Sequence, residues 1–420
     1  MTEAEDRTAC EDRPIRLLAL TVGGSSEPLK TALREVRPDR VLFIVSEPAE
    51  GQQSSATMVP ELCQADGCPS ETCMLVVPAD NPDRAFALIL TRLEKALAKG
   101  HEVIADYTGG TKSMSAALVM AARMLGGIAL QVTTGKRLDL VKVADGSEQP
   151  VRVDDTAVSL RLKLRVAEDL VRSRSYAAAL AVLPSSEAAA PLLPKRWRDT
   201  LASWRNALAV LELWDRFDHC EAWKFLCDRG GGRAGRLGRW LDGFGLCDRL
   251  ELLAEAAKAG KPSAALCEDL WWNAQRRAAQ GAFDDAVARL YRLAEAAVQA
   301  QLSERGIDQT SRVPVERLAP SLRARHGQPG ADGTVMLALT DACEQLAHED
   351  PESPVPALWR NGQPSWQGRR NRSILAHGFR PLGADDWREA EQWFEAHAAR
   401  LWRDLPGGEA ARQLPDRLPE

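Results

Sequence analysis

Residues 368–379 read Gly-Arg-Arg-Asn-Arg-Ser-Ile-Leu-Ala-His-Gly-Phe and so combine three arginines, an amide and a histidine. If this stretch is helical, a rotation of about 100° per residue places Arg370 and His377 on one face. Arg372 then lies well round the helix from His377, unless the stretch begins as irregular structure. Gly378 would end the helix, because glycine readily takes the left-handed conformation found there. Periodicity therefore favours Arg370 as the partner of His377.

Histidine and arginine side chains on one surface can cleave a phosphodiester without a metal ion. Histidine moves a proton near neutral pH, and arginine holds a phosphate and the charge that develops on it. The 2′-hydroxyl of RNA would be the nucleophile. The alternative is a basic helix end, in which His377 interacts with the helix dipole and the arginines are only solvated. Residue types alone leave both interpretations open.

The composition describes a globular chain whose total charge does not attract nucleic acid. The 420 residues are 45% hydrophobic and 27% charged, with a formal net charge of -5. This length favours two or three domains. Contact with RNA must therefore come from a local basic patch. The arginines available for such a patch near His377 are Arg360, Arg369, Arg370 and Arg372.

No stretch of the sequence is long and apolar enough to span a bilayer, and Arg123 interrupts the nearest candidate, residues 114–132. Because the acidic N-terminus also lacks the features of a secretion signal, we expect a cytoplasmic protein with no membrane partner. Nine cysteines scattered along the chain suit reduced thiols. Cys63, Cys68 and Cys73 have intervals that a zinc site could use, but a fourth ligand is missing nearby. We expect incidental thiols and no metal.

Short apolar runs alternate with helical patterns in the first third of the chain. The expected strands are residues 15–22, 41–45, 74–77, 101–106 and 128–133. The helices expected between them are residues 28–36, 81–99 and 113–125. This alternation indicates a Rossmann-like α/β domain, with a mostly parallel sheet covered on both faces. Residues 151–153 are expected to pair with residues 138–143 as an antiparallel edge.

From Thr156 onward strand signals nearly vanish, so we expect an all-α C-terminal half. The longest expected helices are residues 160–183, 196–227, 264–279, 284–305 and 384–402. The predicted domains are an α/β domain at 1–155, a helical connector at 156–280, a helical domain at 281–405 that contains His377, and a frayed tail at 406–420.

Two glycine-rich loops follow strands of the expected sheet. Residues 21–26 read Thr-Val-Gly-Gly-Ser-Ser, and residues 106–113 read Asp-Tyr-Thr-Gly-Gly-Thr-Lys-Ser before a helix. Open parallel sheets bind ligands at the carboxyl ends of their strands. Glycines, a helix N-terminus and Lys112 together suit an anionic nucleotide, although ordinary tight turns would look similar. Neither loop matches a Walker loop or a dinucleotide fingerprint, which weakens the ATPase and dehydrogenase interpretations.

Three segments in this order resemble a known family. The two glycine-rich loops are similar to those of the CARF domain, the nucleotide-sensing domain of type III CRISPR ancillary proteins. The segment Arg-Asn-Arg-Ser-Ile-Leu-Ala-His resembles the Arg-x4-6-His motif of HEPN ribonucleases, and residues 283–292 resemble the first HEPN helix. The chain as a whole therefore resembles a CARF–HEPN ribonuclease of the type III CRISPR antiviral system.

The resemblance implies a homodimer in which two CARF domains enclose a cyclic oligoadenylate activator. Cyclic tetra-adenylate is favoured over hexa-adenylate, and no cofactor is expected. The implied contacts with the ring are Thr21, Gly23, Gly24, Ser25, Ser46, Thr108, Gly109, Gly110, Thr111 and Lys112.

Paired HEPN domains would join both Arg/His sets into one composite site that cuts single-stranded RNA without metal. His377 is the first implied catalytic residue. The family spacing admits both Arg370 and Arg372, and Asn371 would orient them. No stable DNA partner is expected. The helical half would transmit a rearrangement of the dimer from the ligand to the catalytic pair.

Three alternatives remain open at this stage. The chain could be a CARF-type sensor without nuclease activity, or a protein that only degrades its cyclic oligoadenylate through Thr108 or Lys112. It could also be a nucleotide-dependent enzyme confined to the sheet domain. An RNase assay with and without cyclic oligoadenylates distinguishes the first two from the ribonuclease.

Overall fold

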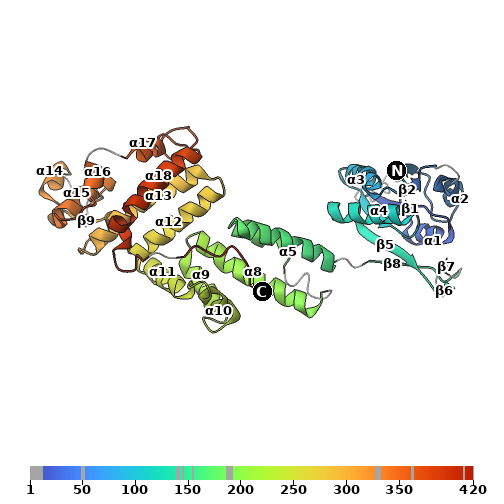
Figure 1. Cartoon of the computed structure of the whole chain (residues 1–420), viewed down its shortest axis with the longest axis horizontal. Coiled ribbons are helices and arrows are strands. Elements are labelled where there is room, and N and C mark those ends of the chain that lie inside the picture. Colours follow the sequence, from blue (N-terminus) through green and yellow to red (C-terminus); the bar gives the residue numbers. More distant parts are fainter. Residues whose placement is uncertain are drawn as a thin grey trace, which may run out of the picture. The chain divides into compact units, whose positions relative to one another are not determined.

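The computed structural model describes residues 13–48, 53–138, 142–143, 146–153, 156–185, 193–326, 333–360, 364–409 and 412–419. The chain divides into two compact units, residues 1–159 and 160–420 (Figure 1). Each unit has its own hydrophobic core. Within the described ranges, no helix has both the length and the hydropathy needed to cross a bilayer.

The first unit contains a six-stranded sheet with the order β3-β2-β1-β4-β5-β8. Its strands are β1 (Arg16–Thr21), β2 (Arg40–Ser46), β3 (Thr72–Val77), β4 (Glu102–Asp106), β5 (Ala129–Thr134) and β8 (Gln149–Arg152). The first five pair in parallel, and β8 joins β5 antiparallel, so the expected pairing of residues 151–153 with residues 138–143 is wrong. A separate two-stranded pair is formed by β6 (Arg137–Leu138) and β7 (Lys142–Val143). The predicted mostly parallel sheet is confirmed.

Helices cover both faces of this sheet, which explains why its central strands are continuously apolar. Leu17 and Ala19 of β1 belong to the core beneath α3 (Pro82–Leu97) and α4 (Lys112–Leu125). Leu18 and Leu20 belong to the opposite core, beneath α1 (Glu27–Val36), α2 (Val59–Cys63) and the short helix η1 (Ser55–Met58). Because β1 and β4 are neighbours in parallel, both glycine-rich loops leave from the same edge of the sheet.

The second unit is helical apart from a two-stranded pair, β9 (Val313–Pro314) with β10 (Thr334–Val335). Its helices are α5 (Thr156–Arg172), which begins in the first unit, α6 (Tyr176–Val182), α8 (Lys195–Asp215), α9 (His219–Asp228), α10 (Arg236–Asp242), α11 (Cys247–Ala259), α12 (Ala264–Ala279), α13 (Phe283–Ser303), η3 (Val315–Arg317), α14 (Pro320–Arg325), α15 (Leu339–Glu349), α16 (Ala357–Arg360), α17 (Ser365–Asn371), α18 (Ala384–Ala398) and the π-helical turn η4 (Ala399–Arg403). The predicted all-α C-terminal half is confirmed.

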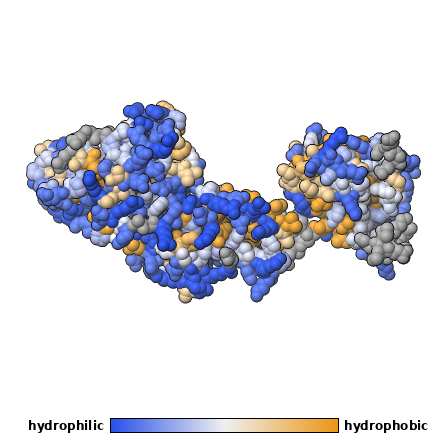
Figure 2. Space-filling view, viewed as in Figure 1, coloured by the Kyte–Doolittle hydropathy of each residue, from blue (hydrophilic) through white to orange (hydrophobic). Residues whose placement is uncertain are grey.

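Two long predicted helices are each broken in the structure. Residues 160–183 divide into α5 and α6, with Arg174 at a φ of 56°, and residues 196–227 divide into α8 and α9, with Phe217 at a φ of 69°. Both breaks use a residue other than glycine in the left-handed region, so no local signal marks them. Hydrophobic residues remain visible over α5 in Figure 2, and Val158, Leu162 and Val166 are each about half exposed on one stripe of this helix.

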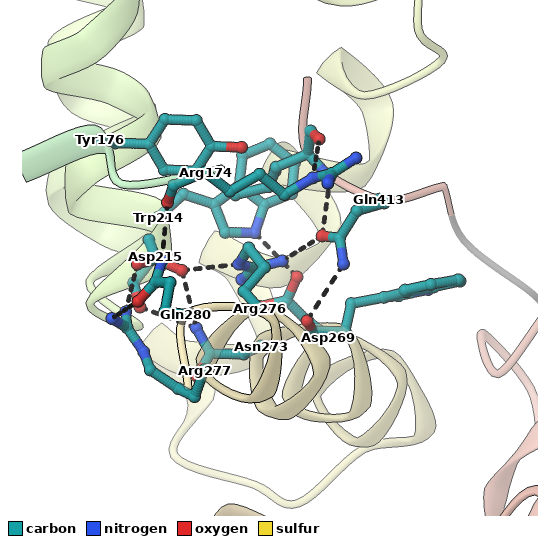
Figure 3. Close-up of polar contacts among 12 residues, drawn as sticks. Arg174, Tyr176, Trp214, Asp215, Asp269, Asn273, Arg276, Arg277, Gln280 and Gln413 are labelled. Atoms are coloured by element: carbon teal, nitrogen blue, oxygen red, sulfur yellow. Dashed lines mark hydrogen bonds and ion pairs between the residues drawn. The ribbon is translucent and has the colours of Figure 1, made fainter. Parts of the chain in front are cut away.

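Residues 412–419, here called the C-terminal strap, pack against the helices of the second unit (Figure 3). The Tyr176 hydroxyl donates to the carbonyl of Pro415 at 2.7 Å, and the Trp204 indole donates to the carbonyl of Pro419 at 2.9 Å. Leu414 is 2% exposed. The prediction of a frayed tail after Leu405 is therefore wrong for these residues. Buried donors on α6 and α8 use the strap's carbonyls as acceptors. These partners are more than 200 residues apart, so local sequence patterns do not predict the contact.

The strap also completes a buried polar network (Figure 3). The Arg276 guanidinium, 1% exposed, donates to Asp215 at 2.6 Å and to the side-chain oxygen of Gln413 at 2.5 Å. Asn273 donates to the same carboxylate at 3.1 Å, and Arg277 also pairs with it. A buried arginine needs such partners, because an unpaired charge away from water is strongly destabilising.

Candidate functional site

The stretch that contains His377 is helical only at its start. The helix α17 ends at Asn371, and turns follow it as far as His377, so the prediction that Arg370 and His377 share a helical face is wrong. Ser373 forms a bridge with Arg380, which folds the chain back on itself. Gly378 does not adopt a left-handed conformation. A Cβ there would lie 2.1 Å from the Arg372 carbonyl oxygen, so glycine is needed for close approach.

This folded turn brings His377 back to the residues that precede it. The backbone N–H of His377 donates to the carbonyl of Asn371 at 3.2 Å. The imidazole is exposed, and among the described residues it has no hydrogen-bond partner. Exposed apolar side chains surround it in sequence: Ile374 is 60%, Leu375 51% and Phe379 93% exposed. His377 is thus free to meet a substrate on a surface that is also able to pack against another molecule.

Arg370 and Arg372 occupy different environments. The Arg370 guanidinium lies over the Tyr291 ring, 4.0 Å from its centroid, and donates to the side-chain oxygen of Asn371 at 3.4 Å. Its Nε is buried without a hydrogen-bond partner within the described part of the chain. Arg372 is exposed and bends back toward Gly368. Arg370 is therefore held by its neighbours, whereas Arg372 is free to reach a ligand.

Arg369 has a structural role on the other side of α17. Its guanidinium binds Asp386 at 2.8 Å and Glu389 at 2.7 Å, both on α18. Burial acts to raise the pKa of Asp386, but hydrogen bonds from Arg369 and from the Gly383 N–H, with the charge of Arg380, lower it below its usual value. Of the four arginines in the predicted basic patch, Arg369 is neutralised, and the side chain of Arg360 lies outside the described residues.

Sequence reasoning did not assign Tyr291 and Glu295, which α13 places next to Arg370. Burial raises the pKa of both side chains, and the positive charge of Arg370 opposes the shift in each case. Tyr291 belongs to the segment that resembles the first HEPN helix, so its position was visible in the sequence. Its role could not be predicted, because Tyr291 meets Arg370 only in the folded structure.

The two glycine-rich loops lie against each other at the carboxyl edge of the sheet. The Thr21 hydroxyl donates to the Gly109 carbonyl at 2.6 Å. A Cβ on Gly23 would lie 2.7 Å from the Gly110 nitrogen, and one on Gly109 would lie 2.3 Å from the Thr21 carbonyl oxygen. Glycine is therefore required here to let the two backbones meet.

The other predicted ligand contacts divide into exposed and internally bonded residues. Gly24, Ser25 and Lys112 are exposed, and Lys112 is the first residue of α4, where free backbone N–H groups favour an anion. Thr111 caps α4 and donates to the Ala79 carbonyl at 2.5 Å.

Thr108 and Ser46 already have protein partners. The Thr108 hydroxyl accepts from the Thr133 N–H at 2.7 Å, and Ser46 exchanges hydrogen bonds with Ser55 at 2.9 Å. Beneath the loop, fully buried Asp106 accepts from the Thr108 N–H and from the Gln131 amide, and burial raises its pKa. These contacts make Thr108 and Ser46 parts of the loop framework.

The described residues contain no group of three His, Cys, Asp or Glu side chains arranged to hold a metal ion. Cys63, Cys68 and Cys73 lie on α2, in a loop and on β3 respectively. Burial raises the pKa of the Cys68 thiol to about 11. Cys73 accepts a hydrogen bond from Arg92 at 3.1 Å.

Comparison with protein families and solved structures supports a specific family. Residues 255–400 match the model of the Csm6 HEPN domain. Csm6 of Enterococcus italicus, solved bound to cyclic hexa-2'-fluoro-hexa-dAMP, matches 93% of this chain and 95% of its own, with a TM-score of 0.50 and 12% identity. Can2 of Sulfobacillus thermosulfidooxidans, solved with cyclic tetra-adenylate, matches 48% of this chain and 66% of its own, with a TM-score of 0.25 and 12% identity. No curated protein sequence matches.

The E. italicus match extends over both units, so the chain shares the Csm6 fold from the sheet to the C-terminal helices. The family match covers α13, α17 and the turn that presents His377. Residues 255–400 therefore match the Csm6 HEPN domain, and the chain as a whole shares the fold of Csm6.

Proposed function

We propose that the protein is an endoribonuclease that cuts single-stranded RNA without metal when a cyclic oligoadenylate binds its sheet domain. The observation that carries this proposal is the exposed imidazole of His377, presented by a folded turn beside Arg370 and Arg372 within a Csm6 HEPN domain. No fold requirement explains this grouping on the surface.

In the proposed reaction the RNA 2′-oxygen attacks the neighbouring phosphorus as its bond to the 5′-oxygen breaks. The products are a 2′,3′-cyclic phosphate and a 5′-hydroxyl. His377 moves the proton between these oxygens, and an arginine stabilises the charge on the phosphoryl oxygens. Arg372 is exposed and suits contact with the phosphate. Arg370 is held against Tyr291, so it contributes charge from a fixed position.

The proposed active species is a homodimer in which two such turns share one catalytic site. Ile374, Leu375 and Phe379 support this assembly, because a cluster of exposed apolar residues beside a catalytic group would be buried by a second copy. The apolar stripe of α5 offers a further surface for the pair.

The proposed activator binds at the carboxyl edge of the sheet, on the loops that begin at Thr21 and Asp106. The exposed Gly24, Ser25 and Lys112 are the residues best placed for direct contact with its phosphates. We expect the activator to be cyclic tetra-adenylate. Cyclic hexa-adenylate is the alternative, because the E. italicus Csm6 structure contains an analogue built from six nucleotides.

The test is cleavage of a fluorescent RNA in EDTA with no ring, with cyclic tetra-adenylate and with cyclic hexa-adenylate. We expect ring-dependent cleavage that His377→Ala abolishes. His348→Ala is the matched control, because His348 is exposed at the end of α15 and should retain full activity. Ring binding without cleavage by the wild type would instead identify a sensor. Degradation of the cyclic oligoadenylate, measured by chromatography, would identify an enzyme that cleaves its own activator.

A further inference from the structure

A cavity of about 340 Å³ lies against α13, where Arg292, Glu295 and Gln299 line it, and Tyr291 of the same helix holds Arg370. Tyr291 and Glu295 are one helical turn apart and so lie on the same side of α13. Glu295 both lines the cavity and is close enough to Arg370 for that charge to influence its ionisation. The cavity therefore begins one helical turn along α13 from the ring that holds the proposed catalytic arginine. Its lining residues include Arg292, Glu295, Gln299, Thr310, Leu337 and Ala342.

Glu295 lines this cavity with a partly exposed carboxylate. Its side chain is 32% exposed, and it pairs with Arg292 at 3.6 Å, a separation longer than a hydrogen bond. Water reaches the carboxylate, so a ligand in the cavity is able to replace that water as a hydrogen-bond donor.

The neighbouring polar groups are held in fixed orientations. The Gln299 side-chain oxygen accepts from Arg292 at 3.0 Å, and its amide donates to the Thr310 hydroxyl at 2.9 Å. The amide therefore keeps one N–H free, with its orientation already determined. Leu337, 5% exposed, and Ala342, 3% exposed, provide an apolar wall. A planar group with polar edges matches such a cavity better than a phosphate does.

We propose that this cavity is a nucleobase subsite, which takes a base of the substrate RNA next to the scissile phosphate. Glu295 accepts from an exocyclic amine, so adenine with its N6 and cytosine with its N4 are favoured over uracil, which has the oxygen O4 at that place. This inference rests on the proposed ribonuclease function, and it adds a basis for sequence preference.

The cleavage experiment uses the activated full-length protein and four RNAs that differ only in the base flanking one cleavable bond. We expect the wild type to cut the uracil substrate about 5- to 100-fold less efficiently in kcat/KM. Glu295→Met should remove this difference. Glu295→Gln should raise cleavage at uracil, because its amide is able to donate to the O4 atom. Glu304→Gln, exposed at the end of α13, is the control and should preserve the preference.

A binding experiment separates this inference from the proposed function. His377→Ala protein with bound activator is titrated with labelled oligoadenylate and oligouridylate RNAs, alone and combined with Glu295→Met. If the wild type cuts no RNA while the His377→Ala protein shows a Glu295-dependent preference for oligoadenylate, the subsite is supported and the ribonuclease is rejected. Active cleavage with the same base profile in wild type and Glu295→Met would reject the subsite and leave the ribonuclease intact.

Discussion

At the residue scale, the contact with the Tyr291 ring holds the flexible Arg370 side chain in one position. A guanidinium over an aromatic ring is attracted by the ring's quadrupole and loses little further entropy when a phosphate arrives. Residue types and spacing identified Arg370, Asn371, Arg372 and His377 as candidates. The helix expected to join them was wrong, because the turn depends on the Ser373–Arg380 bridge and on a contact of Gly378 that adjacent residues do not encode.

Replacing Tyr291 by alanine should lower kcat for RNA cleavage by about 3- to 30-fold, the size of a cation–π contact. Tyr291→Phe keeps the ring and should stay near wild-type activity. Steady-state kinetics with saturating activator measure both variants. An equal loss in Tyr291→Phe would mean that the hydroxyl, and not the ring, is what matters.

Asp386 should make the protein less stable in acid. Its pKa is lower in the folded chain than the reference value of 3.8, so the unfolded chain binds the proton more readily. The stabilisation is present above the unfolded pKa and is lost as pH falls through the folded value. Asp386→Asn should cost about 1–2 kcal/mol at neutral pH and flatten the stability profile below about pH 4.

Urea denaturation across pH measures this effect of Asp386. Asp385→Asn is the control, because Asp385 is 85% exposed and pairs only with Arg388 at the surface. An equal loss in the two variants would reject the role given to Asp386.

At the element scale, the two glycine-rich loops act as one unit because parallel pairing of β1 and β4 aligns their ends. Alternating strands and helices were enough to predict this edge from the sequence. The sequence could not show which polar groups are already bonded inside the protein. Ser46 and Thr108 were predicted to bind ligand, yet their hydroxyls bond Ser55 and Thr133.

Gly109→Ala should weaken activator binding by at least about tenfold, because the new methyl group would displace the Thr21 carbonyl and separate the loops. Gly383→Ala is the matched control, since it lies in the second unit and a Cβ there meets no atom within 4 Å. Titration of labelled cyclic oligoadenylate measures both affinities, and circular dichroism confirms that each variant is folded. Unchanged affinity in a folded Gly109→Ala protein would exclude the apposed loops as the binding edge.

Deleting the C-terminal strap should destabilise the second unit by about 2–4 kcal/mol, because Arg276 loses a partner and buried donors on α6 and α8 lose their acceptors. Chemical denaturation of protein truncated after residue 411 gives the value. Arg412→Ala, at an exposed position of the strap, should be neutral. A truncated protein with wild-type stability would mean that the strap's contacts are not retained in solution.

At the scale of the whole molecule, the proposed activity requires a second copy. The described residues around His377 leave Phe379 93% exposed, an unusual position for a phenylalanine in an isolated chain. The domain order was predicted from motifs, whereas the surface that joins two protomers has no comparable sequence signature.

Phe379→Asp should raise the dimer dissociation constant by at least about tenfold, because it places a charge in the contact. Cleavage by the variant should recover as protein concentration rises. Analytical ultracentrifugation gives the association state, and activity against concentration gives the functional effect. A variant that remains dimeric but inactive would assign Phe379 to the RNA contact instead.

The strap has a consequence for how the chain is made. Trp204 and its acceptor at Pro419 are separated by 215 positions, and Tyr176 and its acceptor at Pro415 by 239. During synthesis, α6 and α8 leave the ribosome long before these acceptors are made. Tyr176 and Trp204 are therefore exposed to water or bound by a chaperone until then. The sheet domain can fold early, but the helical half lacks these contacts until residues 412–419 emerge. Ribosome-bound chains stalled before that point should therefore remain sensitive to protease around α6 and α8.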